Sequence, residues 1–263
     1  METMEFIIEN KFKGAYPEPI PAHLALPQWV KDQPNREEGI HLNNKGTAFS
    51  PTYKRCVPFM DIMRTGYILP LWVDLGFSYD ECTPEECGDE NCPRTSIHVD
   101  WKESIGEGRL QSKFGKVVES RAWSSWGNIP ELETSVPNSS MTFINPWTIK
   151  TPPGYSTLIT APFNDDSRPH PAIKTLTGLV NTDTYFNPIT FFFHVKYGFN
   201  GTLKKGTPLV QLIPIKREDW EHQVTYTSPG DETELKGLQE RNYLDSVFEN
   251  AYREKHGCPV NFK

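Results

Sequence analysis

Apolar residues in the second half of the chain recur in short runs separated by turn-forming residues, a pattern typical of β-strands. The runs cover residues 157–162, 174–181, 187–195 and 209–215. The third run contains Phe191-Phe192-Phe193, and because no polar residue alternates with these rings we expect both faces of that strand to be buried. The 23 prolines and 18 glycines are spread along the chain and favour short strands over long helices. The predicted fold class is mainly β.

The first half of the chain predicts fewer regular elements. Residues 4–9 have the pattern of a short strand. The prolines between residues 15 and 27 exclude a helix or a central strand there, so we expect an extended arm lying on the core. Trp29 is the expected aromatic anchor of this arm. Residues 32–52 are polar and rich in glycine and asparagine, which predicts a mobile loop.

A short helix and a strand are predicted next. Pro58 and Gly66 bracket the helix, with proline at its start and glycine after its end. Residues 67–75 follow as a largely buried strand, in which Pro70 implies an edge position or a bulge.

A long amphipathic helix is predicted over residues 231–257. Asp231 followed by Glu234 suits a capping box at its start, and apolar side chains then recur at spacings of three and four. The apolar positions are Leu235, Leu238, Leu244, Val247, Phe248, Ala251 and Tyr252. We expect this stripe to pack on the β core or, alternatively, on a partner protein.

The length of the chain, 263 residues, is enough for one domain with elaborations. We predict a single domain over 1–263, in which a Pro-rich arm and irregular insertions (1–140) precede a β core (141–217) and the C-terminal helix. Only 37% of the residues are apolar, but 15 Phe, 10 Tyr and 7 Trp can build a sizeable core.

The charge of the chain narrows the choice of partners and compartment. The net charge of −7, without a run of Lys and Arg, argues against nucleic acid as a partner. Apolar runs fall short of the ~20 residues that span a bilayer, and the N-terminus lacks a signal-peptide pattern. We therefore expect a chain without a membrane partner, located in the cytoplasm (the host cytoplasm, for a viral protein) or in a virion. Five cysteines, an odd number, argue against a disulfide framework there.

One acidic segment concentrates the metal-ligand chemistry of the sequence. Cys82, Cys87, Cys92 and His98 could supply three thiolates and an imidazole to a structural zinc ion. Their spacing is wider than that of a Cys-x-x-Cys knuckle, so an acidic loop with free thiols is the alternative. Beyond this zinc, no cofactor is predicted.

Three motifs between residues 145 and 217 occur in a familiar order. They are the turn Pro153-Gly154-Tyr155, the hairpin from Gly178 to Tyr185, and the turn and strand from Lys205 to Leu212. In that order they resemble the motifs of the dUTPase and dCTP deaminase superfamily, which implies a β-clip core and, by analogy, a homotrimer. The longer pattern from Asn145 to Trp220 is similar to an uncharacterised family of tailed-phage and bacterial proteins, and that resemblance covers nearly the whole chain.

The resemblance also implies a ligand site. Its positions here are Gly154, Tyr155, Asn181, Asp183, Tyr185 and Gln211. The family's water-activating Asp corresponds to Asn181, whose amide cannot act as a general base. Asp183 could replace it if the register shifts, and Tyr185 matches the aromatic that stacks on the base. Alternatively, Asp183 and Tyr185 only shape the hairpin turn.

Other parts of the family's catalytic set are missing. The phosphate-binding Arg-Ser-Ser motif would fall at residues 160–164, which read Thr-Ala-Pro-Phe-Asn. The Gly-rich C-terminal arm is replaced by the predicted helix. The deaminase's Glu, which follows a Thr-Leu pair, is absent from Thr190-Phe191-Phe192.

These gaps favour a non-catalytic protein that acts through protein or ligand binding, such as a virion or assembly component of phage origin. It would associate with itself or with another phage or host protein. Two alternatives are a divergent nucleotide-binding enzyme, similar to a dUTPase pyrophosphatase and using Asp183 and Tyr185, and a zinc-stabilised accessory protein.

Overall fold

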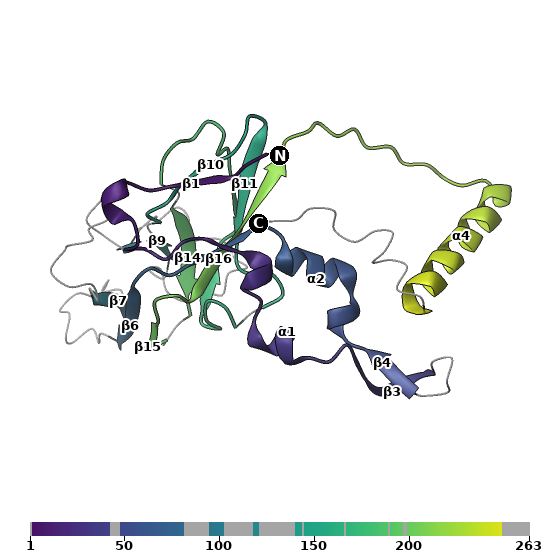
Figure 1. Ribbon diagram of the computed structural model, residues 1–263, viewed down its shortest axis with the longest axis horizontal. Helices are drawn as coiled ribbons and strands as arrows, with labels where there is room; N and C mark the ends of the chain where they lie inside the picture. Colours follow the sequence, from purple (N-terminus) through teal and green to yellow (C-terminus); the bar gives the residue numbers. More distant parts are fainter. Residues whose placement is uncertain are drawn as a thin grey trace. The chain divides into compact units, whose positions relative to one another are not determined.

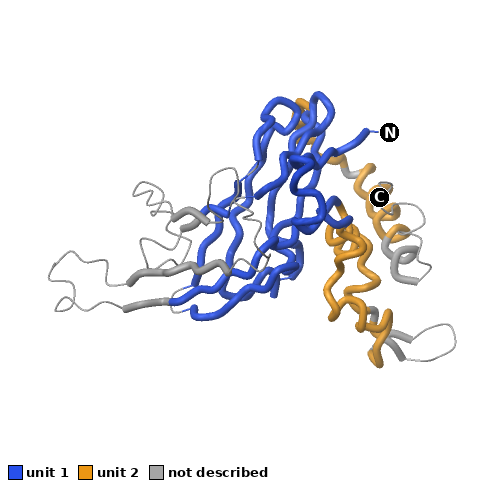
Figure 2. The backbone as a smooth tube through the Cα atoms, turned by 60° about the vertical axis from the view of Figure 1, so that its left-hand side comes forward, with its two compact units in different colours: residues 1–21, 66–217 blue, residues 22–65, 218–263 orange. Residues whose placement is uncertain are grey.

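The structure of the protein is a computed structural model. The structure describes residues 2–42, 48–81, 95–102, 118–120, 140–143, 145–165, 167–188, 190–196 and 199–248. These residues form a mainly β structure of several antiparallel sheets with a helix near the C-terminus. The sequence predicted one domain. The structure divides into two compact units, residues 1–21 with 66–217 and residues 22–65 with 218–263 (Figure 2).

A five-stranded antiparallel sheet forms the centre of the first unit (Figure 1). Its order is β13-β11-β16-β5-β2. The strands are β2 (Ile20–Pro21), β5 (Tyr67–Pro70), β11 (Tyr155–Thr160), β13 (Gly178–Val180) and β16 (Pro208–Lys216). The predicted strands over 157–162 and 209–215 are confirmed as β11 and β16.

Pro70 has the effect that the sequence predicted. The pairing of β5 with β16 shifts register between Pro208 and Val210, opposite the end of β5. Because proline has no N–H to give to the ladder, an irregularity at this point is the expected consequence.

Three smaller sheets complete the first unit. One has the order β12-β14-β9-β8, a second the order β15-β6-β7, and the third pairs β1 with β10. The strands are β1 (Glu5–Ile7), β6 (Asp74–Glu81), β7 (Thr95–Lys102), β8 (Val118–Ser120), β9 (Ser140–Phe143), β10 (Thr148–Lys150), β12 (Ile173–Thr175), β14 (Phe191–Val195) and β15 (Gly201–Leu203). The strand predicted over 4–9 is confirmed as β1.

The single strand predicted over 174–181 is wrong, because the chain changes sheets there. β12 ends at Thr175 in the four-stranded sheet, and β13 begins at Gly178 in the five-stranded sheet. The N–H of Leu176 still donates to the carbonyl of Phe192 at 2.9 Å, whereas the Thr177 hydroxyl lies 3.0 Å from that of Thr160 on β11. The two residues between the strands therefore bond to different sheets.

The core of the first unit lies between these sheets. Ile159, Val210 and Leu212 from the five-stranded sheet share one buried cluster with Phe191 and Phe193. Burying a side chain of this size contributes ~1.5–3 kcal/mol. The prediction that both faces of β14 are buried is only partly right, because the intervening Phe192 is half-buried.

The N-terminal arm is anchored by a residue other than the predicted one. Tyr16 is 4% exposed and packs edge-on against Trp72, with 4.9 Å between ring centroids. Trp29 instead lies in the short helix α1 (Gln28–Asp32) and is 39% exposed. Its neighbour Val30 supplies the buried side chain.

In the second unit, a hairpin replaces the mobile loop predicted over 32–52. It consists of β3 (Arg36–Leu42) and β4 (Ala48–Pro51). The helix predicted after Pro58 is confirmed as α2 (Val57–Arg64). Val30 packs with Met60 and Met63 of this helix in a small separate cluster. Short 3-10 turns occur at Asn10–Phe12, Ala22–Leu24 and Tyr53–Arg55.

The C-terminal helix α4 (Pro229–Phe248) confirms the predicted helix over its described part. Its start lies earlier than predicted. Ser228 precedes the helix, its hydroxyl donates to the Asp231 carboxylate at 2.5 Å, and the N–H of Asp231 donates to the Ser228 carbonyl at 3.0 Å. Ser228 is therefore the N-cap residue, and Asp231 is its hydrogen-bonding partner within the first turn. Pro229 occupies the first helical position, which suits proline. Across the described residues, the helices are all too short or too polar to cross a bilayer.

Candidate functional site

Two of the three sequence motifs, the turn before β11 and the hairpin after β13, meet at one end of the five-stranded sheet, where β16 ends. The turn of the third motif precedes the opposite end of β16, which begins at Pro208. Tyr155, at the start of β11, pairs with Lys216 at the end of β16, and Thr157 pairs with Val180 at the end of β13. The turn before β11, the turn after β13 and the residue after β16 are therefore neighbours.

Asp183 is held by a donor from the turn before β11 and by a donor from the residue after β16. The Gly154 N–H donates to its Oδ2 at 2.9 Å. The Arg217 guanidinium donates one N–H to Oδ1 at 3.0 Å and forms a second, shorter bond to Oδ2. The Asp183 side chain is 6% exposed. The pKa of its carboxyl is lowered from 3.8 to about 2, first because of the hydrogen bond from Arg217 and then because of the Gly154 N–H.

Arg217 connects the two turns to the sheet. Its guanidinium also donates to the Tyr155 carbonyl at 2.8 Å and to the Ser156 hydroxyl oxygen at 2.9 Å. Its backbone N–H donates to the Gly154 carbonyl at 2.8 Å. A planar guanidinium that grips a carboxylate with two N–H groups fixes orientation as well as charge.

Asn181, the position where the resemblance predicted a water-activating Asp, faces the same guanidinium. Its Oδ1 accepts from the Ser156 hydroxyl at 2.8 Å and lies 3.4 Å from the Arg217 guanidinium. The amide oxygen is thus used in the turn.

Buried hydroxyl groups lie beneath this surface cluster. The Thr182 side chain is fully buried, and its hydroxyl lies 2.7 Å from that of Thr151 and 2.8 Å from that of Thr157. Sequence reasoning did not select Arg217, Ser156 or Thr182 as site residues. Ser156 and Arg217 lie at strand ends next to the motifs, and Thr182 lies within the hairpin motif. The strand register that brings the three together could not be read from one sequence.

Two of the predicted ligand-binding residues lie outside the cluster. Gln211 is 1% exposed in the middle of β16, opposite Thr160, and its side-chain oxygen accepts from the Phe163 N–H at 3.0 Å. It supports the loop after β11. Tyr185 closes the hairpin turn through its N–H, which donates to the Asn181 carbonyl at 2.9 Å, while its side chain is 49% exposed.

Three of the four predicted zinc ligands, Cys82, Cys87 and Cys92, lie outside the residues that the structure describes. His98 lies in β7, opposite Ser78 of β6. Within the described part of the chain, His, Cys, Asp and Glu residues form no group of three or more that could hold a metal ion.

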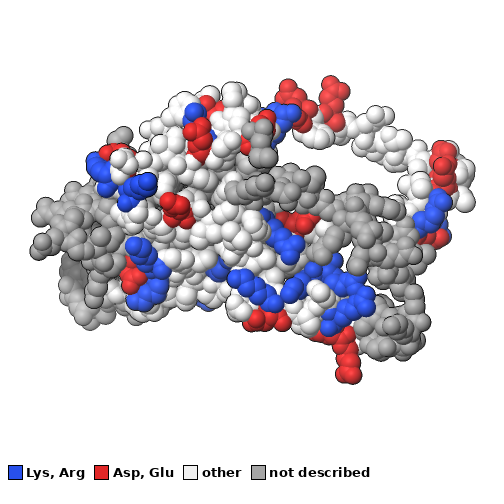
Figure 3. All heavy atoms as spheres, viewed as in Figure 1, with Lys and Arg blue, Asp and Glu red and all other residues white. Residues whose placement is uncertain are grey.

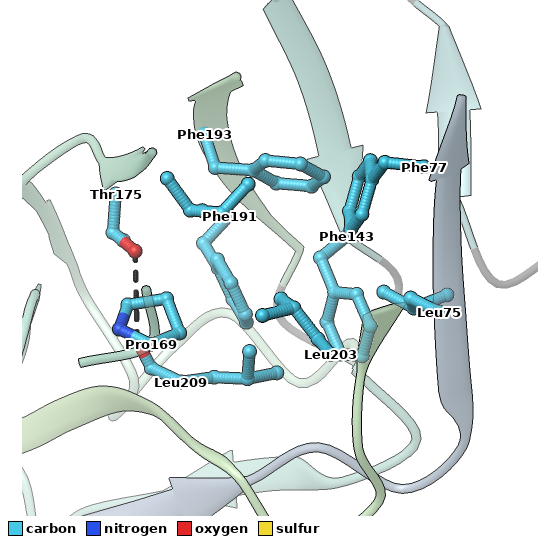
Figure 4. Close-up of a pocket in the computed structure, with 10 residues that line it drawn as sticks. Leu75, Phe77, Phe143, Pro169, Thr175, Phe191, Phe193, Leu203 and Leu209 are labelled. Carbon is cyan, nitrogen blue, oxygen red and sulfur yellow. Dashed lines mark hydrogen bonds between the residues drawn. The ribbon is translucent and has the colours of Figure 1, made fainter. Parts of the chain in front are cut away.

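An apolar pocket lies in the core, away from the cluster. Figure 4 shows side chains of Phe143, Phe191 and Leu203 around this space, with Pro169 at one side. The space has room for about one water molecule. The Thr175 hydroxyl beside it donates to the Leu209 carbonyl at 3.5 Å. We interpret this space as a packing gap between the sheets.

The cluster of Asp183, Arg217, Asn181 and Ser156 is a closed set of mutual hydrogen bonds. A carboxylate paired with a guanidinium is a poor proton acceptor, because protonation would break the pair.

Comparison with protein-family models gave no match, and comparison with curated proteins gave none either.

Proposed function

We propose that this chain is a non-catalytic binding protein, and that its β core is a dUTPase-like β-clip used as a scaffold. The observation that carries this proposal is the binding of Asp183 by Arg217 and Gly154. The one carboxylate in the motif that could have replaced the missing base is engaged in holding the turn.

The loop after β11 supports the same proposal. The family's phosphate-binding motif is absent there, and the cation that follows is engaged. The Arg168 Nε donates to the buried Asp165 carboxylate at 2.5 Å. Removing Arg168 from this pair to bind phosphate would leave a buried carboxylate without its charged partner, which is costly.

We infer that the partner is a protein, either a second copy of this chain or another phage or host protein, as in a virion or assembly component. On the face shown in Figure 3, the visible Lys and Arg side chains lie close to Asp and Glu side chains. Such a mixed surface, with the net charge of −7, favours a protein partner over a polyanion.

A turnover assay tests the proposal. Purified protein is incubated with a panel of nucleoside triphosphates and magnesium, and pyrophosphate and ammonia are measured. We expect neither product above the level of a blank without protein. Turnover that Asp183→Asn abolishes, in a variant whose circular dichroism shows it folded, would overturn the proposal. That result would support the alternative, a divergent nucleotide-binding enzyme that uses Asp183 and the exposed ring of Tyr185.

A further inference from the structure

The segment between β16 and α4 has the residue pattern of a strand. Trp220, His222, Val224 and Tyr226 occupy every second position, and Glu221, Gln223 and Thr225 lie between them. In an extended chain, such alternation places the large side chains on one face and the small or polar ones on the other.

This segment is extended but has no strand partner among the described residues. Trp220 is 86% exposed, Val224 is 68% exposed and Tyr226 is 89% exposed. Three large side chains so exposed at alternate positions indicate a surface that another protein covers.

The same molecule carries an exposed sheet edge. β13 is the outermost strand at one side of the five-stranded sheet, as far as the structure describes the chain. Its Leu179 is 58% exposed and pairs with Leu158, which in turn pairs with Ile213 of β16. An apolar row therefore crosses three strands and ends at the open edge. An edge of this kind is a template for a further strand.

Two more exposed rings follow the same strand. Tyr185 is 49% exposed and Phe186 is 56% exposed, directly after the turn that ends β13. They extend the apolar surface beyond the three residues that β13 offers for backbone pairing.

We propose that residues 220–226 of one copy of this chain add as a strand to the β13 edge of a second copy. Backbone hydrogen bonds to β13 supply affinity, and the alternating apolar side chains supply specificity by lying along Leu179 and its row. Copies joined in this way exchange their C-terminal segments.

The occupant is a second copy because the segment cannot reach the β13 edge of its own chain over its full length. Arg217 is fixed beside β11 by its backbone bond to the Gly154 carbonyl and by its side-chain bond to the Tyr155 carbonyl. Trp220 is three residues further on and lies at most ~11 Å away. A strand outside β13 lies three strand spacings from β16, or ~14 Å.

This inference names a partner for the binding role proposed above and rests on it only to that extent. The two fail separately. Nucleotide turnover would overturn the binding role without affecting strand exchange, whereas a strictly monomeric chain would overturn strand exchange without creating an enzyme.

Association is tested by the molar mass from light scattering after size exclusion, over a wide range of protein concentration. A monomer has a mass of 30.1 kDa, and we expect the mass to rise to a multiple of this value with concentration. Val224→Lys, which places a charge on the apolar face, is expected to raise the dissociation constant by about tenfold or more. Thr225→Lys is the matched control on the opposite face and is expected to have little effect.

Leu179→Lys tests the accepting edge in the same way. Leu179 is exposed, so the variant is expected to fold, and thermal melting confirms this. A monomeric mass at every concentration would overturn the proposal, as would equal effects of Val224→Lys and Thr225→Lys.

Cross-linking shows whether the pairing joins two chains. Leu179→Cys and Val224→Cys are made in separate proteins, both in a Cys56→Ser background because Cys56 is an exposed free thiol. We expect the oxidised mixture to yield the peptide that links positions 179 and 224, identified by mass spectrometry. Its absence from the mixture, with its formation in a single chain carrying both changes, would overturn exchange between copies.

Discussion

Asp183 and Arg217 show how one residue's partners decide what it can do. A carboxylate in the hairpin motif of this sequence is a candidate base, but the guanidinium at the end of β16 and the Gly154 N–H keep it ionised and engaged. The residue that the motif provides for chemistry is here part of the structure of the turn.

Acid should therefore weaken the fold through Asp183. Its pKa of about 2 lies below the ordinary value of 3.8, so the carboxylate's contribution is present above pH ~4 and is lost as the pH falls through ~2. Asp183→Asn removes that contribution. We expect the free energy of unfolding of the variant to lie below that of the wild type at neutral pH, and the difference to shrink between pH ~4 and pH ~2. Urea denaturation at several pH values measures it, and a difference independent of pH would contradict the assigned role.

Alanine substitutions at Gly154 and Gly66 distinguish the stability cost of backbone strain alone from that of strain combined with a steric clash. Gly154 has φ +84 and open space where a Cβ would lie, whereas Gly66 has φ +75 and a built Cβ lies 2.1 Å from the Leu212 carbonyl oxygen. Gly154→Ala is expected to cost ~1–2 kcal/mol of unfolding free energy, and Gly66→Ala more, because β16 must also shift. Gly178→Ala, with open space and no positive φ, is the control and is expected to change stability by less than ~0.5 kcal/mol. Chemical denaturation compares them, and equal costs at residues 154 and 66 would contradict the collision.

At the residue scale, the sequence predicted several members of the Asp183 cluster but not the contacts between them. Gly154, Asn181 and Asp183 were selected from motifs, and the structure brings them together. Arg217 was not selected, because only the pairing of Tyr155 with Lys216 places it beside them. Gln211 was selected by resemblance, and its environment is that of a buried support.

At the scale of elements, the hairpin after β13 is attached to β11 by buried hydroxyls. Thr182 contacts Thr151 and Thr157 at once, so hydrogen bonds link the hairpin turn to β11 and to the residue before the Pro-Pro-Gly-Tyr segment.

This arrangement predicts a contrast between two neighbouring threonines. Thr182→Val keeps the shape of the side chain but removes the hydroxyl to which Thr157 bonds, while Thr151 keeps its bond to the Tyr155 carbonyl at 3.3 Å. The variant is expected to cost ~1–3 kcal/mol of unfolding free energy. Thr184, which is exposed and whose hydroxyl donates to the Asn181 carbonyl at 3.3 Å, is the control, and Thr184→Val is expected to cost less than ~0.5 kcal/mol. Thermal unfolding distinguishes them, and equal shifts in Tm would contradict a role for the buried cluster.

Strands that begin directly after a glycine turn could be predicted from the sequence. β11 and β16 follow glycine turns and were found. The break between β12 and β13 was missed because Leu176 and Thr177 are not turn-forming residues. The change of sheet there is set by their hydrogen bonds to different sheets. The β3–β4 hairpin was missed because its polar sequence lacks an apolar period, and strand propensity depends on such context.

At the scale of the whole molecule, residues 22–65 form an insertion between two parts of the first unit. β2 and β5 pair with each other, Pro21 opposite Tyr67, so the chain leaves and returns at adjacent points. Such an insertion lengthens the loop between paired strands at a small entropic cost, which explains how one sheet can include strands so far apart in sequence.

Limited proteolysis reports on the segment after β16. Chymotrypsin cuts after aromatic residues, and among the described residues we expect the first cuts after Trp220 or Tyr226, because both are more than 80% exposed in an extended segment. Strand exchange would protect them, so the rate of cutting is expected to fall as the protein is concentrated. Cleavage at Tyr53, which is 65% exposed and lies outside the proposed interface, is the internal control. Equal concentration dependence at both places would contradict protection by exchange.

The position of β16 also has a consequence for how the protein is made. It lies at the centre of the five-stranded sheet, between β11 and β5, yet it is the last strand in the sequence among the described residues. Until Pro208 and the residues after it are synthesised, the strand that lies between β5 and β11 is missing. We therefore expect the edges of β5 and β11 that face β16 to stay unpaired. We expect folding of this sheet to wait until synthesis is nearly complete and to be slow, because its pairs are remote in sequence. During that interval we expect the nascent chain to be a substrate for chaperones.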